Sequence, residues 1–195
     1  PNSAQANLAG HILRIEEAGG DCAAESFSWD VFVMGGDPDA TTLTAPTRSG
    51  SPAHVSNAYD GAPTTIGDRF ACPDNIFIDS TQRVWIATDG NDGVFADCND
   101  CVVTTSVNGE GPREVKRFLV GPMGGEICGP LMTPDERAFL CAVQHPGANN
   151  VAGVDYFQLR WTGEPATSHF PDGGDTWPRS AVVIVTRDDG GRIGD

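Results

Sequence analysis

The stretch from residue 70 to 93 places the tightest constraint on what this chain can fold into. Two short runs of mostly apolar residues, 76–79 and 84–88, are separated by a polar turn. Short alternating runs on either side of a turn predict a β-hairpin. Asp74 precedes the first run, and Asp89 and Asp92 follow the second. Because the start of the first strand and the end of the second lie at the same end of a hairpin, we expect these carboxylates to converge.

The same pattern of short strands and turn formers continues along the chain. Its 24 glycines and 14 prolines punctuate the apolar runs, and no long amphipathic helix pattern occurs. About nine strands and an all-β fold follow from this pattern. The strands are expected at residues 11–16, 27–34, 76–79, 84–88, from 94 into the turn at 98–101, 102–107, 113–120, 138–144 and 180–187.

Strand spacing suggests repeating units the size of a propeller blade, roughly 40 to 50 residues each. Two segments, PDNIFIDSTQRVWIAT and TPDERAFLCAVQ, fit the inner strands of successive blades. A closed ring needs at least about four blades. We therefore expect residues 1–195 to form a single portion of a β-propeller, with roughly three to four blades of an incomplete ring. Residues 35–69 and 147–178 are expected to be loop-rich insertions.

The formal net charge of -15 limits the classes of partner. An acidic surface repels nucleic acid phosphates, so a nucleic acid partner is not expected. Acidic residues suit cation binding, most readily calcium; on composition alone, a solvated acidic surface explains the charge better. No apolar run is long enough for a membrane span. The first ten residues lack a signal-peptide pattern, which does not indicate a cytosolic origin.

Six cysteines, at positions 22, 72, 98, 101, 128 and 141, leave the disulfide pattern open. A zinc site usually needs two CxxC pairs or a matching histidine pair, and only Cys98 and Cys101 form such a pair. A local disulfide or two thiols are the alternatives for that pair. Cys128 and Cys141 flank a strand-turn-strand segment and are the better disulfide candidate.

Several segments occur in order along the chain, among them GHILRIEEAGGD, CPDNIFIDSTQRVWIATDG, GGEICGPLMTPDERAFLCAVQHPG and WPRSAVVIVTRDDGGRIG. Together they resemble the C-terminal part of the PhoX family of calcium-dependent alkaline phosphatases. The resemblance covers nearly the whole chain. It implies a β-propeller with iron and calcium at its centre, a phosphomonoester substrate, and a periplasmic or secreted protein exported by the twin-arginine route.

Family members are much longer, so the resemblance also implies a missing partner. The missing N-terminal portion of the same protein would supply the cysteine ligand of iron, further carboxylates and the basic residues that hold phosphate. We expect this chain to be a C-terminal fragment that contributes metal-site residues and is inactive alone. Its sequence contains no GxSxG motif, no P-loop and no Ser-His-Asp order, so the catalytic and substrate-binding residues stay unknown.

Five residues are candidate metal ligands. Asp74 matches a calcium-binding position of the family, whereas an Asx-type turn cap is the structural alternative. Glu126 lies among glycines that let backbone approach a ligand, and an ion pair is its equal alternative. Asp89 and Asp92 lie after the hairpin, where acidic residues are more often solvated than bound to metal. His145 could bind iron or orient a carboxylate, although a histidine at the end of a strand is more often structural. Among basic residues that could reach phosphate, strand-edge charge is the favoured interpretation; these are Arg113, Lys116, Arg117 and Arg179.

Two other functions stay open. The PDN and VWIATDG words also resemble calcium-dependent lactonase propellers, which lack the GGEICGP and QHPG words. A non-catalytic propeller that serves as a binding or structural subunit is the third interpretation. Metal-bound hydroxide or oxide is the expected source of the nucleophile in the phosphatase interpretation.

Overall fold

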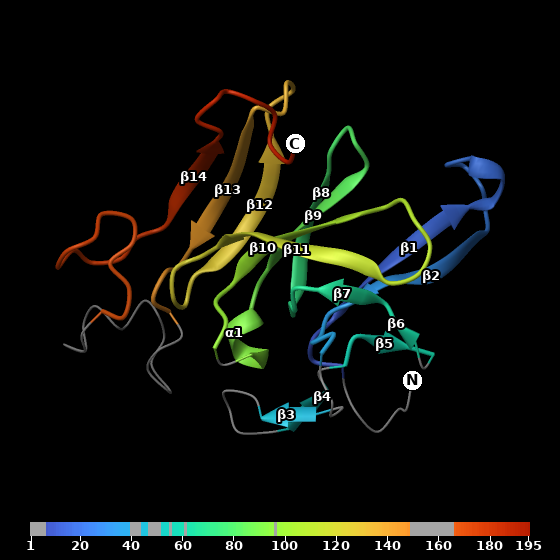
Figure 1. Cartoon of the computed structure of the whole chain (residues 1–195), viewed down its shortest axis with the longest axis horizontal. Helices are drawn as coiled ribbons and strands as arrows, with labels where there is room; N and C mark the ends of the chain where they lie inside the picture. Colours follow the sequence, from blue (N-terminus) through green and yellow to red (C-terminus); the bar gives the residue numbers. More distant parts are fainter. Residues whose placement is uncertain are drawn as a thin grey trace.

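The computed structural model describes residues 7–39, 44–46, 52–54, 56–60, 62–95, 97–148 and 166–195. Within these ranges the chain is almost entirely β, with one four-residue helix, α1 (Asn91–Val94), and a 3₁₀ turn at Ala18–Gly20 (Figure 1). The strands are β1 (His11–Glu17), β2 (Phe27–Met34), β3 (Thr44–Pro46), β4 (Pro52–His54), β5 (Ala58–Tyr59), β6 (Ala62–Pro63), β7 (Thr65–Gly67), β8 (Pro73–Ile78), β9 (Arg83–Thr88), β10 (Cys101–Ser106), β11 (Arg113–Val120), β12 (Glu126–Met132), β13 (Ala138–Gln144) and β14 (Ala181–Thr186).

Two sheets form the centre of the molecule. In the first, β8, β9, β10 and β11 follow one another as an antiparallel meander, and β7 adds to β11 in parallel. The second contains β12, β13 and β14, with β12 packed against β8 and β9. β1 and β2 form a separate antiparallel pair. This arrangement confirms the predicted all-β, propeller-like fold, and the described strands form part of a ring rather than a closed one.

The hairpin of β8 and β9 is held at its turn by Asp79. This buried carboxylate accepts hydrogen bonds from the backbone N–H groups of Thr81 and Arg83, at 2.8 and 3.0 Å. Its second oxygen accepts the indole N–H of Trp85 at 2.9 Å. Burial alone would raise the pKa of Asp79, but these hydrogen bonds and one from the Thr81 hydroxyl lower it below its ordinary value. One side chain therefore fixes both the turn and the core residue Trp85 of β9.

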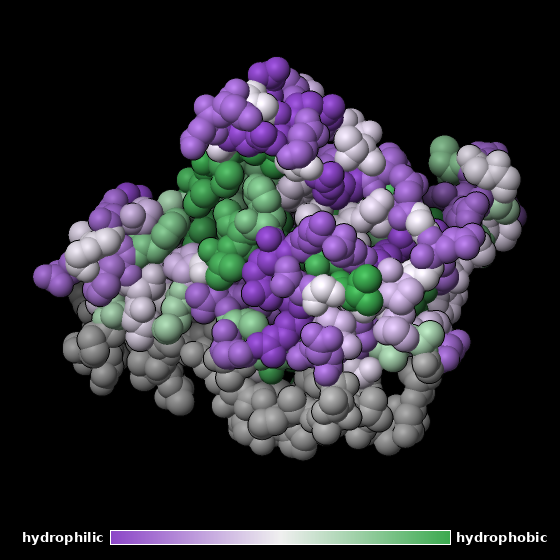
Figure 2. Space-filling model, viewed as in Figure 1, coloured by the Kyte–Doolittle hydropathy of each residue, from purple (hydrophilic) through white to green (hydrophobic). Residues whose placement is uncertain are grey.

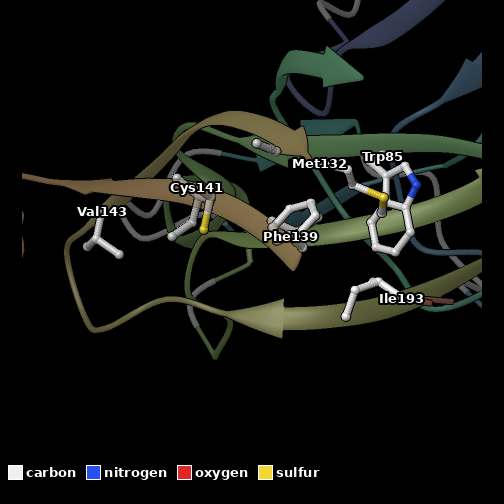
Figure 3. Close-up of a cluster of buried hydrophobic side chains, with 9 residues drawn as sticks. Trp85, Met132, Phe139, Cys141, Val143 and Ile193 are labelled. Carbon is white, nitrogen blue, oxygen red and sulfur yellow. The ribbon is translucent and has the colours of Figure 1, made fainter. Parts of the chain in front are cut away.

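The central strands β9 and β10 are buried on both faces. Trp85, Ala87 and Val102 face the β12–β14 sheet in a cluster with Phe139 and Ile127, among others (Figure 3). The rings of Trp85, Phe118 and Phe139 contact one another with centroid separations of 4.9 to 5.3 Å. On the other face, side chains of β9 and β10 pack against β2 and the segment before β8. The central strands contribute Val84, Ile86 and Val103, and their partners include Phe32, Val33 and Phe70.

Two predictions about elements were wrong, and one strand occurs within a segment that was expected to be loop-rich. Residues 91–94 form α1 instead of leading into a strand, because the Asn91 side chain donates to the Asn99 carbonyl and Asp100 accepts the N–H groups of Gly90 and Asn91, which folds the loop onto itself. Within the predicted loop 35–69, β7 pairs with β11, a partner too distant in sequence to leave a local pattern. The segment TPDERAFLCAVQ was expected to supply the inner strand of a blade, but its strand, β13, lies in the middle of its sheet. The edge position, which β8 occupies in the other sheet, is taken here by β12. A bulge at Gly129 interrupts the alternation of β12 and concealed it.

The predicted disulfide between Cys128 and Cys141 is also wrong, and none of the six cysteines forms a disulfide. Cys128 pairs across the strands with Ala142, so Cys141 lies one position away. Successive side chains of a strand point to opposite faces. Cys141 therefore enters the core, where burial raises the pKa of its thiol, while Cys128 lies on the opposite face. Cys98 and Cys101 remain thiols, the second of two alternatives for this pair.

The predicted insertion at 147–178 lies partly outside the described residues, since residues 149–165 are not among them. The same holds for parts of the segment 35–69. Among the described residues, no helix has the length and apolar character needed to span a membrane.

Candidate metal centre

Glu126 begins β12 opposite Gln144, the last residue of β13. Its side chain is 11% exposed, which is unusual for a carboxylate without partners. The Gln144 amide donates a hydrogen bond to one carboxylate oxygen, Oε2. The thiol of Cys128 lies 2.9 Å from the other, Oε1. Both oxygens are therefore oriented by neighbours on the same pair of strands.

His145 follows β13 and faces the same carboxylate. Its Nε2 lies 3.2 Å from Glu126 Oε2, and its Nδ1 lies 3.3 Å from the carbonyl oxygen of Gly124. Both ring nitrogens face oxygen acceptors, and a neutral ring can donate to only one of them. The backbone of His145 has φ of 37°, in the left-handed region that residues other than glycine rarely adopt. Such strain costs about 1–3 kcal/mol and persists where surrounding contacts enforce it, often at functional sites.

The backbone N–H of His145 donates to the Ser180 hydroxyl at 3.2 Å, and Ser180 directly precedes β14. Three strands of one sheet thus hold His145 and Glu126 together. Glu126 begins β12, His145 directly follows β13, and Ser180, which binds the His145 N–H, directly precedes β14.

Asp74 and Asp89 lie at one end of the hairpin, as expected. Pro73 pairs with Thr88 across β8 and β9, and the Asp89 N–H donates to the Cys72 carbonyl at 3.0 Å. Both aspartates are exposed. Asp74 lies at the start of β8, in a bulge, rather than before the strand as predicted.

This end of the hairpin adjoins the Glu126 cluster. The side chain of Asn75 accepts the Gly129 N–H at 2.8 Å, which joins β8 to β12. Burial raises the pKa of the Cys128 thiol to about 12, and the hydrogen bond to Glu126 and the negative charges of Glu126, Asp74 and Asp89 add to the rise. Carboxylates from β8, the end of β9 and β12 therefore act on one thiol.

The fifth candidate, Asp92, lies in α1, and its side chain is outside what the structure describes. The loop that carries α1 is organised by the buried Asp100, which accepts hydrogen bonds from the Thr88 hydroxyl and from the N–H groups of Gly90 and Asn91. Within the described part of the chain, no three His, Cys, Asp or Glu side chains gather closely enough to hold a metal ion.

Sequence reasoning missed the residues that orient Glu126. For Gln144, the available signal was its position directly before the candidate ligand His145 in the motif QHPG. Cys128 was interpreted as a disulfide partner, and nothing local indicated that its thiol contacts a carboxylate. Of the basic candidates, Arg179 forms a two-point ion pair with Asp172, at 3.0 Å for each contact, in line with the favoured structural interpretation.

Comparison with known proteins assigns the chain to a family. The family described as alkaline phosphatase PhoX matches residues 1–147. Among solved structures, the chain is similar to Pseudomonas fluorescens PhoX in complex with vanadate, a transition state analogue. The two are 30% identical with a TM-score of 0.66, over 96% of this chain and 28% of that one. A search of curated proteins found no match.

This chain thus spans little more than a quarter of the length of the solved relative. The family match covers well over half of the chain, and the fold agrees over almost all of it. The chain belongs to the alkaline phosphatase PhoX family.

Proposed function

We propose that the intact protein is a metal-dependent phosphomonoesterase and that this chain contributes one side of its metal centre. The observation that carries the proposal is the buried, oriented carboxylate of Glu126, contacted by His145, with Asp74 and Asp89 nearby. The solved relative was captured with vanadate, a transition state analogue, which supports phosphoryl chemistry for that protein.

The residues present fit the two metals implied by the family. Calcium takes about six to eight oxygen ligands, and carboxylates are its usual protein donors. Glu126, Asp74, Asp89 and Asp92 would hold calcium. An imidazole suits iron, so His145 would be an iron ligand or would orient a ligating carboxylate. When bound, the metals supply Lewis-acid polarisation of the phosphoryl oxygens and lower the pKa of bound water.

The residues around Glu126 keep its carboxylate in one orientation. Gln144 donates to Oε2, the thiol of Cys128 faces Oε1, and His145 is tied to Gly124 and Ser180. Partners of this kind fix ligand direction before the metal arrives, and their loss typically costs about 10- to 100-fold in metal affinity.

The remaining ligands and the phosphate-binding cations come from another portion of the same polypeptide. Two observations support this: the chain matches 28% of its solved relative, and its described residues hold no complete ligand set. The 195-residue chain alone is therefore inactive. We propose further that the intact protein is exported to the periplasm or outside the cell by the twin-arginine route, as the resemblance implies.

The decisive experiment compares Glu126→Gln with wild type in the full-length protein. The amide keeps the size of the side chain but removes its charge, so we expect kcat/KM for an aryl phosphate to fall by more than about 100-fold, with loss of bound metal. Metal content is measured by mass spectrometry. The control is Glu114→Gln, which removes an exposed carboxylate on β11 that pairs with Lys116.

Retention of both metal and activity by Glu126→Gln would contradict the proposal. Lactone hydrolysis without phosphatase activity in the wild-type protein would favour a lactonase. Wild-type protein that holds neither iron nor calcium would favour a non-catalytic propeller.

A further inference from the structure

The two central sheets differ by one strand. In the first, β8, β9, β10 and β11 follow one another as four antiparallel strands, whereas the second contains only β12, β13 and β14 (Figure 1). A propeller blade typically contains four strands. In the described part of the chain, β14 pairs with β13 alone, so the other edge of β14 has no strand beside it. The second sheet is therefore one strand short of a blade.

The open edge of β14 lacks the features that keep edge strands from pairing. Natural proteins protect exposed edges with proline, charged side chains, bulges or very short strands. The other edges of the two central sheets have such features: β8 contains Pro73 and a bulge, β12 contains Pro130 and a bulge, and β7 is three residues long. β14 reads AVVIVT, without charge or proline, and pairs with β13 in an unbroken register. Its sequence is typical of a strand that is paired on both sides.

Both faces of β14 are apolar. Val183 and Val185 pack against the core cluster that contains Trp85, while Val182 and Ile184 lie exposed on the opposite face. A strand added at this edge would form main-chain hydrogen bonds along β14 and cross-strand apolar contacts on either face.

The segment after β14 is held elsewhere. Arg192 forms an ion pair with Glu136 in the turn between β12 and β13, and the Ile193 N–H donates to the Glu136 carbonyl at 2.8 Å. The side chain of Ile193 is buried in the core cluster, and the Gly194 carbonyl accepts a hydrogen bond from Arg83 at 2.9 Å. These contacts tie residues 192–194 to the turns of the two sheets, so they do not pair along β14.

We propose that the open edge of β14 pairs with a strand from the portion of the same polypeptide outside residues 1–195. The chain matches 28% of the length of its solved relative, so a protein of that length has ample sequence to supply the strand. The added strand would complete the blade and join the rest of the polypeptide to the sheet that carries Glu126 and leads to His145. The pairing depends on the fold and not on phosphoryl chemistry, so it does not fail if the intact protein proves not to be a phosphatase.

Hydrogen exchange at single-residue resolution in the full-length protein tests the pairing. In an antiparallel strand, the N–H groups of successive residues point alternately to the two edges. We expect all the amides of β14 to exchange as slowly as those of β13, which pairs on both sides and is the internal reference. Alternating slow and fast amides along β14 would show an open edge and overturn the proposal.

Two proline variants give an independent check. Val183→Pro and Ile184→Pro are neighbours, so one removes an N–H directed at β13 and the other an N–H directed at the open edge. With strands on both sides, each variant should lower the thermal midpoint of the full-length protein by about 4 °C or more. If one of the two is tolerated without a shift, the edge is open and the proposal is wrong.

Two further measurements identify the source of the strand. Sedimentation should show that the protein with slow β14 amides is a monomer, whereas slow exchange confined to a dimer would assign the strand to a second copy and overturn the proposal. Replacing residues 149–165, which lie outside the described residues, by a glycine–serine linker of equal length should leave the β14 amides slow. Fast alternate amides in that variant would assign the strand to this chain instead and also overturn the proposal.

Discussion

Glu126 and Asp79 are both buried carboxylates, but their surroundings give them different roles. Asp79 accepts hydrogen bonds from the turn that it closes and from Trp85, so its negative charge is satisfied within the fold. Glu126 is contacted by Gln144, Cys128 and His145, with Asp74 and Asp89 adding negative charge nearby. A cluster that gathers carboxylates in this way is suited to a cation.

Asp79→Asn is expected to destabilise the protein by about 1–3 kcal/mol at neutral pH, because a buried charge-assisted hydrogen-bond network is weakened. The hydrogen bonds hold the pKa of Asp79 below its ordinary value. Its contribution is therefore present above the unfolded-state pKa, about 3.9, and is lost as pH falls through the lower folded-state value.

Urea unfolding of wild type and Asp79→Asn from pH 7 down to pH 3 checks this. The difference in free energy of unfolding between the two proteins should shrink below about pH 4. A difference that stays constant over that range would show that the Asp79 carboxylate makes no charge-dependent contribution.

Strands and loops fix where the candidate ligands meet. β12 packs against β8 and β9, and the side chain of Phe139 on β13 also reaches the five-stranded sheet. Its ring contacts both Trp85 of β9 and Phe118 of β11, with ring centroids 5.3 and 5.0 Å apart. The end of the same strand carries Gln144 and leads to His145. Packing at one end of β13 therefore positions the site at its other end.

Phe139→Ala is expected to lower the free energy of unfolding by about 3–5 kcal/mol, because it removes a fully buried ring and leaves a cavity between the sheets. Phe139→Leu, which fills much of that space, should cost considerably less. Equal losses for the two variants, measured by urea denaturation, would argue against packing as the cause.

The loop after β9 depends on Asp100. Its carboxylate accepts hydrogen bonds from Thr88, Gly90 and Asn91, and the loop carries Asp89 and α1. Asp100→Ala is expected to speed hydrogen exchange at the amides of Gly90 and Asn91 by about tenfold or more, since opening becomes easier by at least about 1.4 kcal/mol. Amides of β13 serve as the internal reference. Unchanged exchange at Gly90 and Asn91 would contradict this role.

The whole molecule exposes apolar sheet faces that other parts of a ring would cover. On β14, Val182 and Ile184 are 66% and 62% exposed, and across the sheet Leu131 of β12 is 52% exposed. Figure 2 shows a hydrophobic area in the region of these strands. The pair β1–β2, on the opposite side of the molecule in Figure 1, exposes Ile15 and Trp29 in the same way. Such exposed sheet faces are typical of interfaces.

Val182→Asp/Ile184→Asp tests whether the rest of the polypeptide covers the β14 face in the full-length protein. Burying two charges at an interface is costly, so we expect a marked fall in thermal midpoint and in soluble yield. The matched control is Thr186→Asp, at an exposed position on the same face of β14. Sedimentation of the wild type checks the alternative, because a dimer that dissociates in Val182→Asp/Ile184→Asp would show that a second copy covers the face.

The sequence by itself determined the elements whose pattern is local. The β8–β9 hairpin, β11, β13 and β14 follow from short-range alternation and turn residues, and the convergence of Asp74 and Asp89 follows from hairpin geometry alone. Short motifs that occur in a fixed order along the chain, such as GGEICGP and QHPG, also indicate the family. These features depend on residues only a few positions apart, which a single sequence displays directly.

Tertiary structure decided everything that depends on distant partners. β7 exists because β11 lies beside it, and β12 was concealed by its own bulge at Gly129. The contacts of Glu126 with Gln144 and His145 require β12 and β13 to pair in one register, and a shift by one residue would turn Glu126 to the other face. Such meetings are set by packing across the whole fold, and no local pattern records them.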